Sequence, residues 1–396
     1  MAGARRAASG RVSAAAMVVA PALAGCGDDA QVQRCLGTTL AQPVLVLEQA
    51  ADRSATGLAR LGTDGCLVEL GGDLALGDDP LLTGADRRVF VLDRQHDTVL
   101  EIDPAGPTIV RTRSALGPTE TRANRWGVDV DADGRMWIAR YDLGSLGLLE
   151  ADGAWGGVVD LGPVAKTLGD PDGNPEISAV RVVGDEVVAA LELLDARDVP
   201  YTTTGPSALA IVRRTPPHDV LRTVALTGAN PFVGFVPDGG AGAGFVTVAT
   251  LGDPELAHTD DPGGVERVAV DGSARRLLLT ESDVGGSIVE AVVVSDREGY
   301  AVVAGPPDAN PTWVVAFDPS SPAGPGRVRQ VLADSRTGDQ PGYVHTGLAV
   351  VGSLVLVGDR SPGAARIRVF GRETGTEAGG VAPAAMPPLQ ILGVER

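Results

Sequence analysis

The feature that most constrains the fold of this chain is a repeat of short apolar segments. Each repeat has an apolar strand, a turn, a second apolar strand, a loop, and a third strand that closes on a turn signal such as Asp103-Pro104 or Asp271-Gly272. The second strand, an apolar run, recurs at intervals of about 45 to 58 residues, a spacing typical of stacked or radially packed units. These runs are Val44–Leu47, Val89–Leu92, Met136–Ala139, Val187–Leu191, Phe245–Ala249, Tyr300–Ala304 and Leu354–Val357.

A further, more polar strand is predicted at the end of each repeat, which makes a four-stranded antiparallel unit. One such unit cannot bury both of its faces, whereas packing the units around an axis buries both and leaves only short edges. The 53 glycines and 28 prolines are spread through the chain, and almost no stretch has the 3.6-residue period of an amphipathic helix. The sequence therefore predicts an all-β fold, a seven-bladed β-propeller over residues 43–396.

The first repeat lacks an innermost strand of its own. The segment 27–42 is polar and rich in Gly and Thr, whereas Pro388–Val394 follows the last repeat and alternates apolar and polar residues. We expect this C-terminal segment to complete the first blade and close the ring, with Leu389, Ile391 and Val394 buried.

Two stretches of strand and turn carry a family resemblance. They are VFVLD…VLEIDP over residues 89–104 and IRVF…TG over residues 367–375, with Gly371 where such repeats usually have aspartate. They resemble the repeats of YVTN and NHL-type propellers, which are common in bacterial exported proteins. This resemblance implies the propeller architecture and no particular activity.

The N-terminus has the features of an export signal. Arg5, Arg6 and Arg11 precede an uncharged apolar stretch, Val12–Leu23, that is too short to span a bilayer. The stretch ends in Leu-Ala-Gly-Cys26, which resembles the lipobox of bacterial lipoproteins. The resemblance implies a signal peptide over residues 1–25, a lipidated Cys26 that attaches the protein to a membrane, and a tether over 26–42.

Gly27 follows the lipobox cysteine where aspartate would favour retention in the inner membrane, so we expect the outer membrane. The alternatives are an ordinary secretory signal with an incidental cysteine, or a cytosolic chain with an Ala-rich start. Cys35 and Cys66 are the remaining cysteines, and an exported chain allows a disulfide between them. The alternative is a pair of free thiols.

Acidic residues outnumber basic ones and limit the partners of the chain. Removing residues 1–25 removes three arginines and no acids, so the net charge goes from −18 to −21. A surface of this charge repels nucleic acids and anionic headgroups. Such a surface attracts cations or basic partners; the alternative is that it serves solubility alone. We expect the protein to be a monomer.

Long loops are predicted on the face of the ring where inner strands begin. Six residues just before these strand starts are the candidate ligand-binding residues, and they suit a polar small ligand or a peptide end. The alternative is that they bind only the backbone at strand ends. These candidates are Asn124, Arg125, Asn174, Glu176, Tyr343 and His345.

Two acidic segments carry oxygen atoms of the kind that Ca²⁺ binds. Asp170, Asp172 and Asn174 offer oxygen ligands for Ca²⁺ in one long loop, with a polar turn as the alternative. Asp129 to Gly134 reads D-x-D-x-D-G, but Arg140 stands where a calcium loop needs an acid, so a hairpin turn is predicted. No other cofactor is expected.

No catalytic motif is present in the sequence. There is no G-x-S-x-G elbow and no H-E-x-x-H, and His96, His258 and His345 are not expected to converge. The sequence therefore favours a binding or scaffolding module for a protein or a small polar ligand. The alternative is a propeller hydrolase, lyase or lactonase that uses a divalent metal in the channel.

Overall fold

The computed structural model describes residues 35–69, 74, 76–105, 108–195, 197, 202–203, 205–252, 263–306, 310–336, 343–381 and 386–394. The predicted signal peptide, Cys26 and His258 lie outside these residues. Contacts within the chain group Gln33–Arg396 into one unit.

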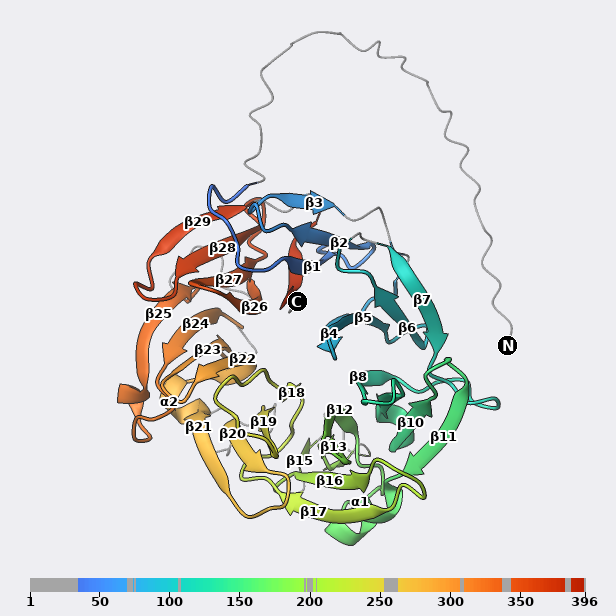
Figure 1. The fold of residues 1–396 in the computed structure, drawn as a ribbon. Coiled ribbons are helices and arrows are strands. Elements are labelled where there is room, and N and C mark those ends of the chain that lie inside the picture. Colours follow the sequence, from blue (N-terminus) through green and yellow to red (C-terminus); the bar gives the residue numbers. More distant parts are fainter. Residues whose placement is uncertain are drawn as a thin grey trace, which may run out of the picture. The chain divides into compact units, whose positions relative to one another are not determined.

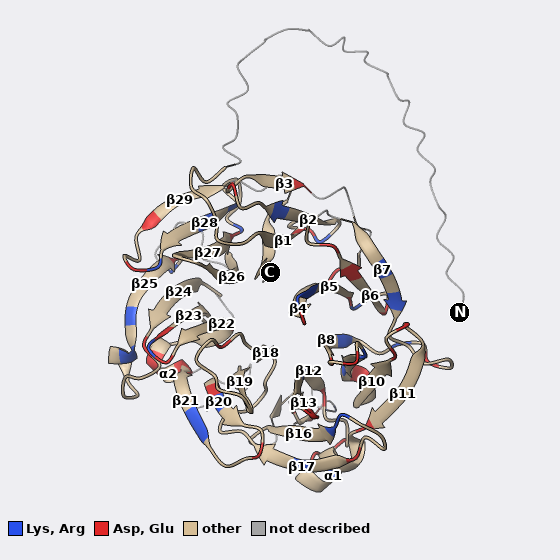
Figure 2. Ribbon diagram, in the orientation of Figure 1, with Lys and Arg blue, Asp and Glu red and all other residues tan. Residues whose placement is uncertain are grey.

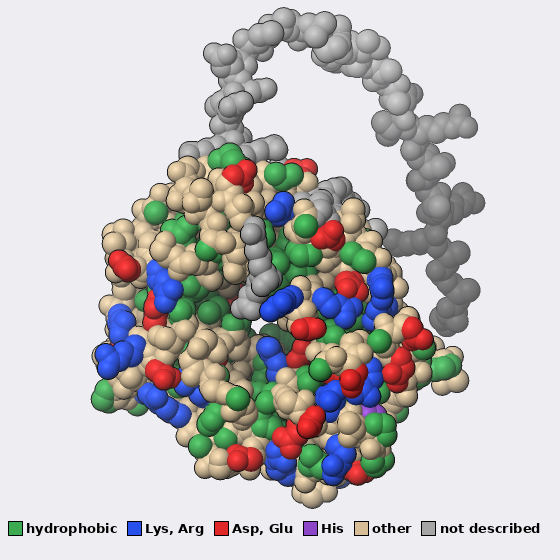
Figure 3. Space-filling model, in the orientation of Figure 1, with side chains coloured by type: hydrophobic (Ala, Val, Ile, Leu, Met, Phe, Trp, Pro, Cys, Tyr) green, Lys and Arg blue, Asp and Glu red, His purple; other side chains and the backbone are tan. Residues whose placement is uncertain are grey.

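This unit is a ring of seven four-stranded antiparallel sheets, and the prediction of a seven-bladed β-propeller is confirmed (Figure 1). The inner strands surround an opening, around which acidic and basic side chains are interspersed (Figure 3). Charged residues of both signs also occur around the whole ring (Figure 2).

Each blade has four strands, ordered from the inner to the outer edge of the ring. Blade 1 is β30 (Pro388–Gly393), β1 (Val44–Gln49), β2 (Thr56–Leu61) and β3 (Leu67–Glu69). Blades 2 and 3 are β4 (Pro80–Ala85), β5 (Arg88–Asp93), β6 (Thr98–Ile102) and β7 (Ile109–Ser114), then β8 (Arg125–Val130), β9 (Met136–Arg140), β10 (Ser145–Leu149) and β11 (Trp155–Asp160). Blades 4 and 5 are β12 (Ile177–Val183), β13 (Glu186–Leu191), β16 (Ala208–Arg213) and β17 (Val220–Ala225), then β18 (Gly234–Phe235), β19 (Phe245–Thr250), β20 (Gly264–Ala269) and β21 (Arg275–Thr280).

Blades 6 and 7 are β22 (Ser287–Ser295), β23 (Glu298–Ala304), β24 (Thr312–Phe317) and β25 (Val328–Asp334), then β26 (His345–Val351), β27 (Leu354–Asp359), β28 (Arg366–Gly371) and β29 (Glu377–Val381). The connections hold a small hairpin and four short helices: β14 (Leu194–Asp195), β15 (Thr202–Thr203), α1 (Gly162–Leu168), α2 (Glu281–Val284), η1 (Tyr141–Leu143) and η2 (Pro325–Arg327).

Burial explains why the second strands are the clearest signal in the sequence. All residues of β1 and β9 are buried, because each lies between two strands of its own blade and between two neighbouring blades. The outer strand β11 instead alternates half-buried and exposed residues, as one covered face predicts.

The C-terminal strand closes the ring as predicted. β30 pairs antiparallel with β1, with Ile391 opposite Val46. Ile391 and Val394 are buried, whereas Leu389 is only partly buried, against the apolar cluster between blades 1 and 2. The first blade is therefore built from both ends of the described chain.

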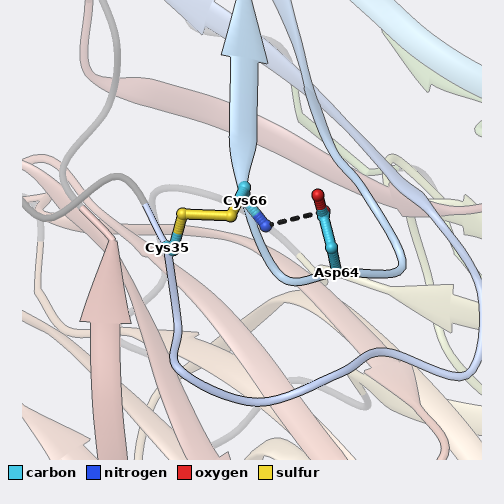
Figure 4. The surroundings of a disulfide bond; sticks show 3 residues. All are labelled: Cys35, Asp64 and Cys66. Atoms are coloured by element: carbon cyan, nitrogen blue, oxygen red, sulfur yellow. Dashed lines mark hydrogen bonds between the residues drawn. A yellow bond between two sulfur atoms is a disulfide. The ribbon is translucent and has the colours of Figure 1, made fainter.

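The predicted disulfide is confirmed. Cys35 and Cys66 are joined, with their Cα atoms 4.0 Å apart, and the Cys66 amide donates a hydrogen bond to Asp64 (Figure 4). The bridge spans 31 residues and ties the segment before β1 to the end of blade 1. In the described part of the chain, no helix has the length and apolar character to cross a membrane.

The D-x-D-x-D-G segment is the predicted hairpin turn, between β8 and β9. The Gly134 amide donates to the Asp131 carbonyl oxygen at 2.8 Å, and Asp131 Oδ1 accepts from the amides of Asp133 and Arg135. Asp131 is thereby committed to its own turn.

Inner strands of neighbouring blades are joined by side chains that accept backbone hydrogen bonds. Asp129 accepts from the Val182 amide at 2.7 Å, and Glu290 accepts from the Leu348 amide at 2.9 Å. A third such bond, from the Leu82 amide to Gln390 at 2.5 Å, joins blades 1 and 2. We call these three bonds the inter-blade latches.

Candidate functional site

Arg125 is the first residue of β8 and lies fully buried between blades 2 and 3. Its Nη1 donates to the carbonyl oxygens of Asp93 and Thr98, at 3.0 and 3.1 Å. Its Nη2 pairs with Asp97 at 2.5 Å, and the same carboxylate accepts the Ala123 amide at 3.0 Å. These contacts make Arg125 a link between two blades.

His345 occupies the corresponding position of blade 7. It is the first residue of β26, and its Nδ1 lies 3.0 Å from the carbonyl oxygen of Thr312 in blade 6. Thr312 and Thr98 both start the third strand of the preceding blade, so His345 and Arg125 make equivalent links. Burial lowers the pKa of His345. Tyr343 lies two residues earlier and is 45% exposed.

Glu176 is the candidate with the most unusual surroundings. It is 1% exposed and has a backbone φ of 41°, in the left-handed region that glutamate rarely adopts. Its Oε2 accepts from the Leu194 amide at 3.1 Å, while Oε1 has no hydrogen-bond partner among the described residues. Burial is the main cause that raises the pKa of Glu176 to about 9, and Asp172 and Asp170 add to it.

Asp170, Asp172 and Asn174 form part of the loop that leads into Glu176. Burial, and then Asp172, raise the pKa of Asp170 to about 6. The Asn174 amide donates to Asp172 Oδ1 at 2.8 Å, which is the bond of a polar turn. Across the described ranges, no three His, Cys, Asp or Glu side chains are grouped so as to hold a metal ion.

The structure adds Glu192, which directly follows the second strand of blade 4. It is fully buried, and its Oε2 accepts the Tyr141 hydroxyl at 2.9 Å. Its backbone amide donates to the carbonyl oxygens of Pro175 and Glu176, at 3.0 and 3.2 Å, so the two glutamates belong to adjacent chain segments. Burial raises the pKa of Glu192 to about 8, although Tyr141 and Arg94 act in the opposite direction.

Three aromatic rings extend this site from blade 3 to blade 5. The Trp126 ring stacks on Tyr141 with centroids 5.0 Å apart, and it meets the Phe232 ring edge-on at 4.8 Å. The Arg94 guanidinium lies 3.9 Å from the Trp126 centroid, and it also forms an ion pair with Asp79. We call Glu192, Tyr141, Trp126, Phe232 and Arg94 the Glu192 cluster.

Asn124, a ligand-binding candidate from the sequence, lies beside the Glu192 cluster and holds one of its residues in place. Its carbonyl oxygen accepts the Tyr141 amide at 3.0 Å, and its Nδ2 donates to Asp142 at 2.9 Å. Asn124 therefore positions Tyr141 through the backbone.

Several buried polar atoms at the site have no partner in the part of the chain that the structure describes. They are the Oε1 atoms of Glu176 and Glu192, Oδ1 of Asn230 and Nε1 of Trp126. A buried polar group without a partner costs about 1–3 kcal/mol. Leu193, next to Glu192, has φ 56°, and a non-glycine residue in this region adds a cost of about 1–3 kcal/mol. Unsatisfied groups and backbone strain thus occur together at this place in the fold.

Three residues of the Glu192 cluster occupy the same position in successive blades. Arg94, Tyr141 and Glu192 each follow the last residue of the second strand in blades 2, 3 and 4. The sequence prediction passed over this position. Alignment of the predicted second strands would have shown three polar side chains at one level of the ring.

Three solved structures illustrate what this chain is similar to. A functionally unknown protein from Desulfotomaculum acetoxidans superposes with a TM-score of 0.54 at 12% identity, over 89% of this chain and 98% of that chain. AztD from Citrobacter koseri gives 0.50 at 10% identity, over 88% and 89%. Virginiamycin B lyase from Staphylococcus aureus, solved with quinupristin, gives 0.47 at 12% identity, over 80% and 92%.

No protein-family model matches the chain, and no curated protein matches it in sequence. At these identities the two structures with TM-scores of 0.50 and 0.54 support the propeller fold and nothing more specific.

Proposed function

We propose that this protein is an exported, lipid-anchored propeller that binds a small polar ligand at the Glu192 cluster. The observation that carries the proposal is the pair of buried carboxyl groups, Glu176 and Glu192, each with one oxygen that lacks a partner among the described residues. Buried polar groups are nearly always satisfied in folded proteins, so such exceptions need an explanation. A ligand that supplies the missing partners explains both.

The surroundings of the two carboxyl groups suit recognition of a ligand. The site lies where loops from blades 2 to 5 meet, and loops on a rigid scaffold commonly carry binding residues. Aromatic walls with a few placed polar groups are the usual lining of small-molecule sites. Phe232 is 44% exposed, which leaves an aromatic surface open to a ligand.

A library of small polar compounds tests the binding function by thermal shift of the purified protein. The variant Glu192→Gln keeps the shape of the side chain and removes its ability to ionise, and Glu290→Gln makes the same change at a latch in blade 6. We expect at least one compound to raise the Tm of the wild type and of Glu290→Gln, but not that of Glu192→Gln. A library without such a compound would contradict the proposal.

The same experiment separates binding from the alternative of a metal-dependent hydrolase, lyase or lactonase. Any stabilising compound is incubated with the protein and a divalent metal, and the mixture is analysed by mass spectrometry. Recovery of the intact compound supports a binding module. Metal-dependent conversion that is lost in Glu192→Gln would replace binding by catalysis.

The lipid anchor at Cys26 is a separate part of the proposal. Its support is the Leu-Ala-Gly-Cys sequence after a short apolar stretch, together with the Cys35–Cys66 disulfide, which suits an oxidising compartment. Two or more acyl chains hold a protein firmly to a bilayer, and we propose the outer membrane. We expect the wild type to partition into detergent and Cys26→Ser not to. A mature N-terminus without lipid in mass spectrometry would refute the anchor.

A further inference from the structure

We infer that the ligand of the Glu192 cluster is a small organic cation whose ammonium group binds the Glu192 carboxylate. The inference rests on the proposed binding function and names the class of its ligand. The buried Glu192 carboxyl without an ion-pair partner among the described residues, the kind of hydrogen-bonding atoms left free and the aromatic walls of the site all support a ligand of this class.

Glu192 has no ion-pair partner in the described chain. Its hydrogen bond comes from the neutral Tyr141 hydroxyl, and the nearby Arg94 is bound elsewhere. Arg94 Nε donates to the Asp79 carbonyl oxygen at 3.1 Å, and its guanidinium forms an ion pair with the Asp79 carboxylate. A buried carboxylate normally has a cationic partner, and here that place is left for a ligand.

The hydrogen-bonding atoms that the ligand must satisfy are mostly of one kind. The unpartnered oxygens of Glu192, Glu176 and Asn230 can all accept a hydrogen bond, Glu192 most strongly once it is ionised, while Glu176, with its pKa raised to about 9, also has a proton to donate. Asn230 is 3% exposed and belongs to the same site. Its backbone N–H donates to Ser207 Oγ at 2.8 Å, and the Ser207 hydroxyl donates to the backbone carbonyl oxygen of Glu192 at 2.8 Å. An ammonium group carries three donors and no acceptor, which complements a set of acceptors.

The aromatic walls of the site also suit a cation. The Arg94 guanidinium lies over the Trp126 ring, which shows that an aromatic face of this site can hold a cation. Tyr141 and Phe232 pack against the same Trp126, and Phe232 is exposed enough to contact a ligand. The remaining Trp126 Nε1 is an unpartnered donor within the described residues, which a hydroxyl or carbonyl oxygen of the ligand would satisfy.

A bare metal ion fits this site less well than an organic cation. Among the residues that the structure describes, no three potential metal-binding side chains are grouped around one point. Aromatic rings supply no oxygen ligands for a hard cation. Both features favour a cation with an apolar part.

Three probes of similar size and different charge test the inference: ethanolamine, ethylene glycol and glycolate. Binding to the wild type, Glu192→Gln and Glu290→Gln is followed by saturation-transfer NMR at constant ionic strength and pH 8. We expect ethanolamine to bind the wild type and Glu290→Gln, with at least a tenfold loss of affinity in Glu192→Gln. We expect ethylene glycol and glycolate not to bind.

Three results would overturn the inference. They are equal binding of ethanolamine to Glu192→Gln, binding of glycolate or ethylene glycol at least as tight as that of ethanolamine, and displacement of ethanolamine by Ca²⁺ at equimolar concentration. If a neutral or anionic compound of the library stabilises the wild type but not Glu192→Gln, the binding function stands while the cation is excluded. Tyr141→Phe is a second variant: it retains the carboxylate and should lower the ethanolamine affinity less than Glu192→Gln does.

Discussion

The buried carboxyl of Glu192 predicts an unusual dependence of stability on pH. In the unfolded chain its pKa is close to the ordinary 4.5, whereas burial raises it to about 8 in the folded protein. The folded state therefore retains a proton that the unfolded state loses between these two values. Its stabilising contribution is complete below pH 4.5 and is lost as the pH rises through about 8.

The magnitude follows from the same two values. The difference corresponds to an upper limit of about 5 kcal/mol at pH 9, because one pKa unit is worth about 1.4 kcal/mol. Glu192→Gln removes the ionisation while it retains an oxygen that accepts the Tyr141 hydroxyl. We expect the variant and the wild type to be about equally stable at pH 5, and the variant to be more stable at pH 9 by about 2–5 kcal/mol.

The assay is the Tm of both proteins by calorimetry or circular dichroism at intervals from pH 5 to pH 9. A domain of this size has an unfolding entropy that converts each kcal/mol into about 1 °C of Tm. The Tm difference should thus grow from near zero to about 2–5 °C. A difference that stays constant over this range, or a variant less stable than the wild type at pH 9, would refute the role given to burial of Glu192.

Three further changes test the fold. Truncation after Met386 removes the closing strand β30. We expect most of the cooperative unfolding transition in calorimetry to be lost, because each large side chain removed from the core costs about 2–5 kcal/mol. An unchanged Tm would mean that another segment closes the ring. Arg125→Leu leaves Asp97 buried without its cation and should lower stability in urea by about 3–5 kcal/mol, whereas a loss below about 1 kcal/mol would contradict the link. Reduction of Cys35–Cys66 should lower stability by about 3–4 kcal/mol, and equal Tm values with and without reductant would refute this.

Most of the fold was predictable because its signals are local. The second strands are apolar over their whole length, and their spacing is regular, so their position and number follow from the sequence. The helix α1 and the hairpin of β14 and β15 were not predicted. α1 is only seven residues long and β14 and β15 two residues each, so their periodic signal is too short to recognise.

The site was predictable only to the level of one face of the ring. The start of an inner strand is indeed a place for polar side chains, but Arg125 and His345 use it to reach the third strand of the preceding blade. Which residues meet across the boundary between two blades depends on tertiary packing. Glu192 and Tyr141 lie 51 residues apart, and no local pattern indicates their hydrogen bond.

The inter-blade latches show why burial of an acidic residue is not enough to identify a binding site. Burial also raises the pKa of Asp129, and that of Glu290 is raised to about 7, yet each accepts an amide of the neighbouring inner strand. Gln390 makes the same bond in blade 1 without any charge, which indicates that the latch needs an acceptor and not a carboxylate. Glu192 differs because one of its oxygens has no partner within the described chain. The latches therefore serve the structure, and the unpartnered oxygen of Glu192 is the observation that supports our proposal of ligand binding at the Glu192 cluster.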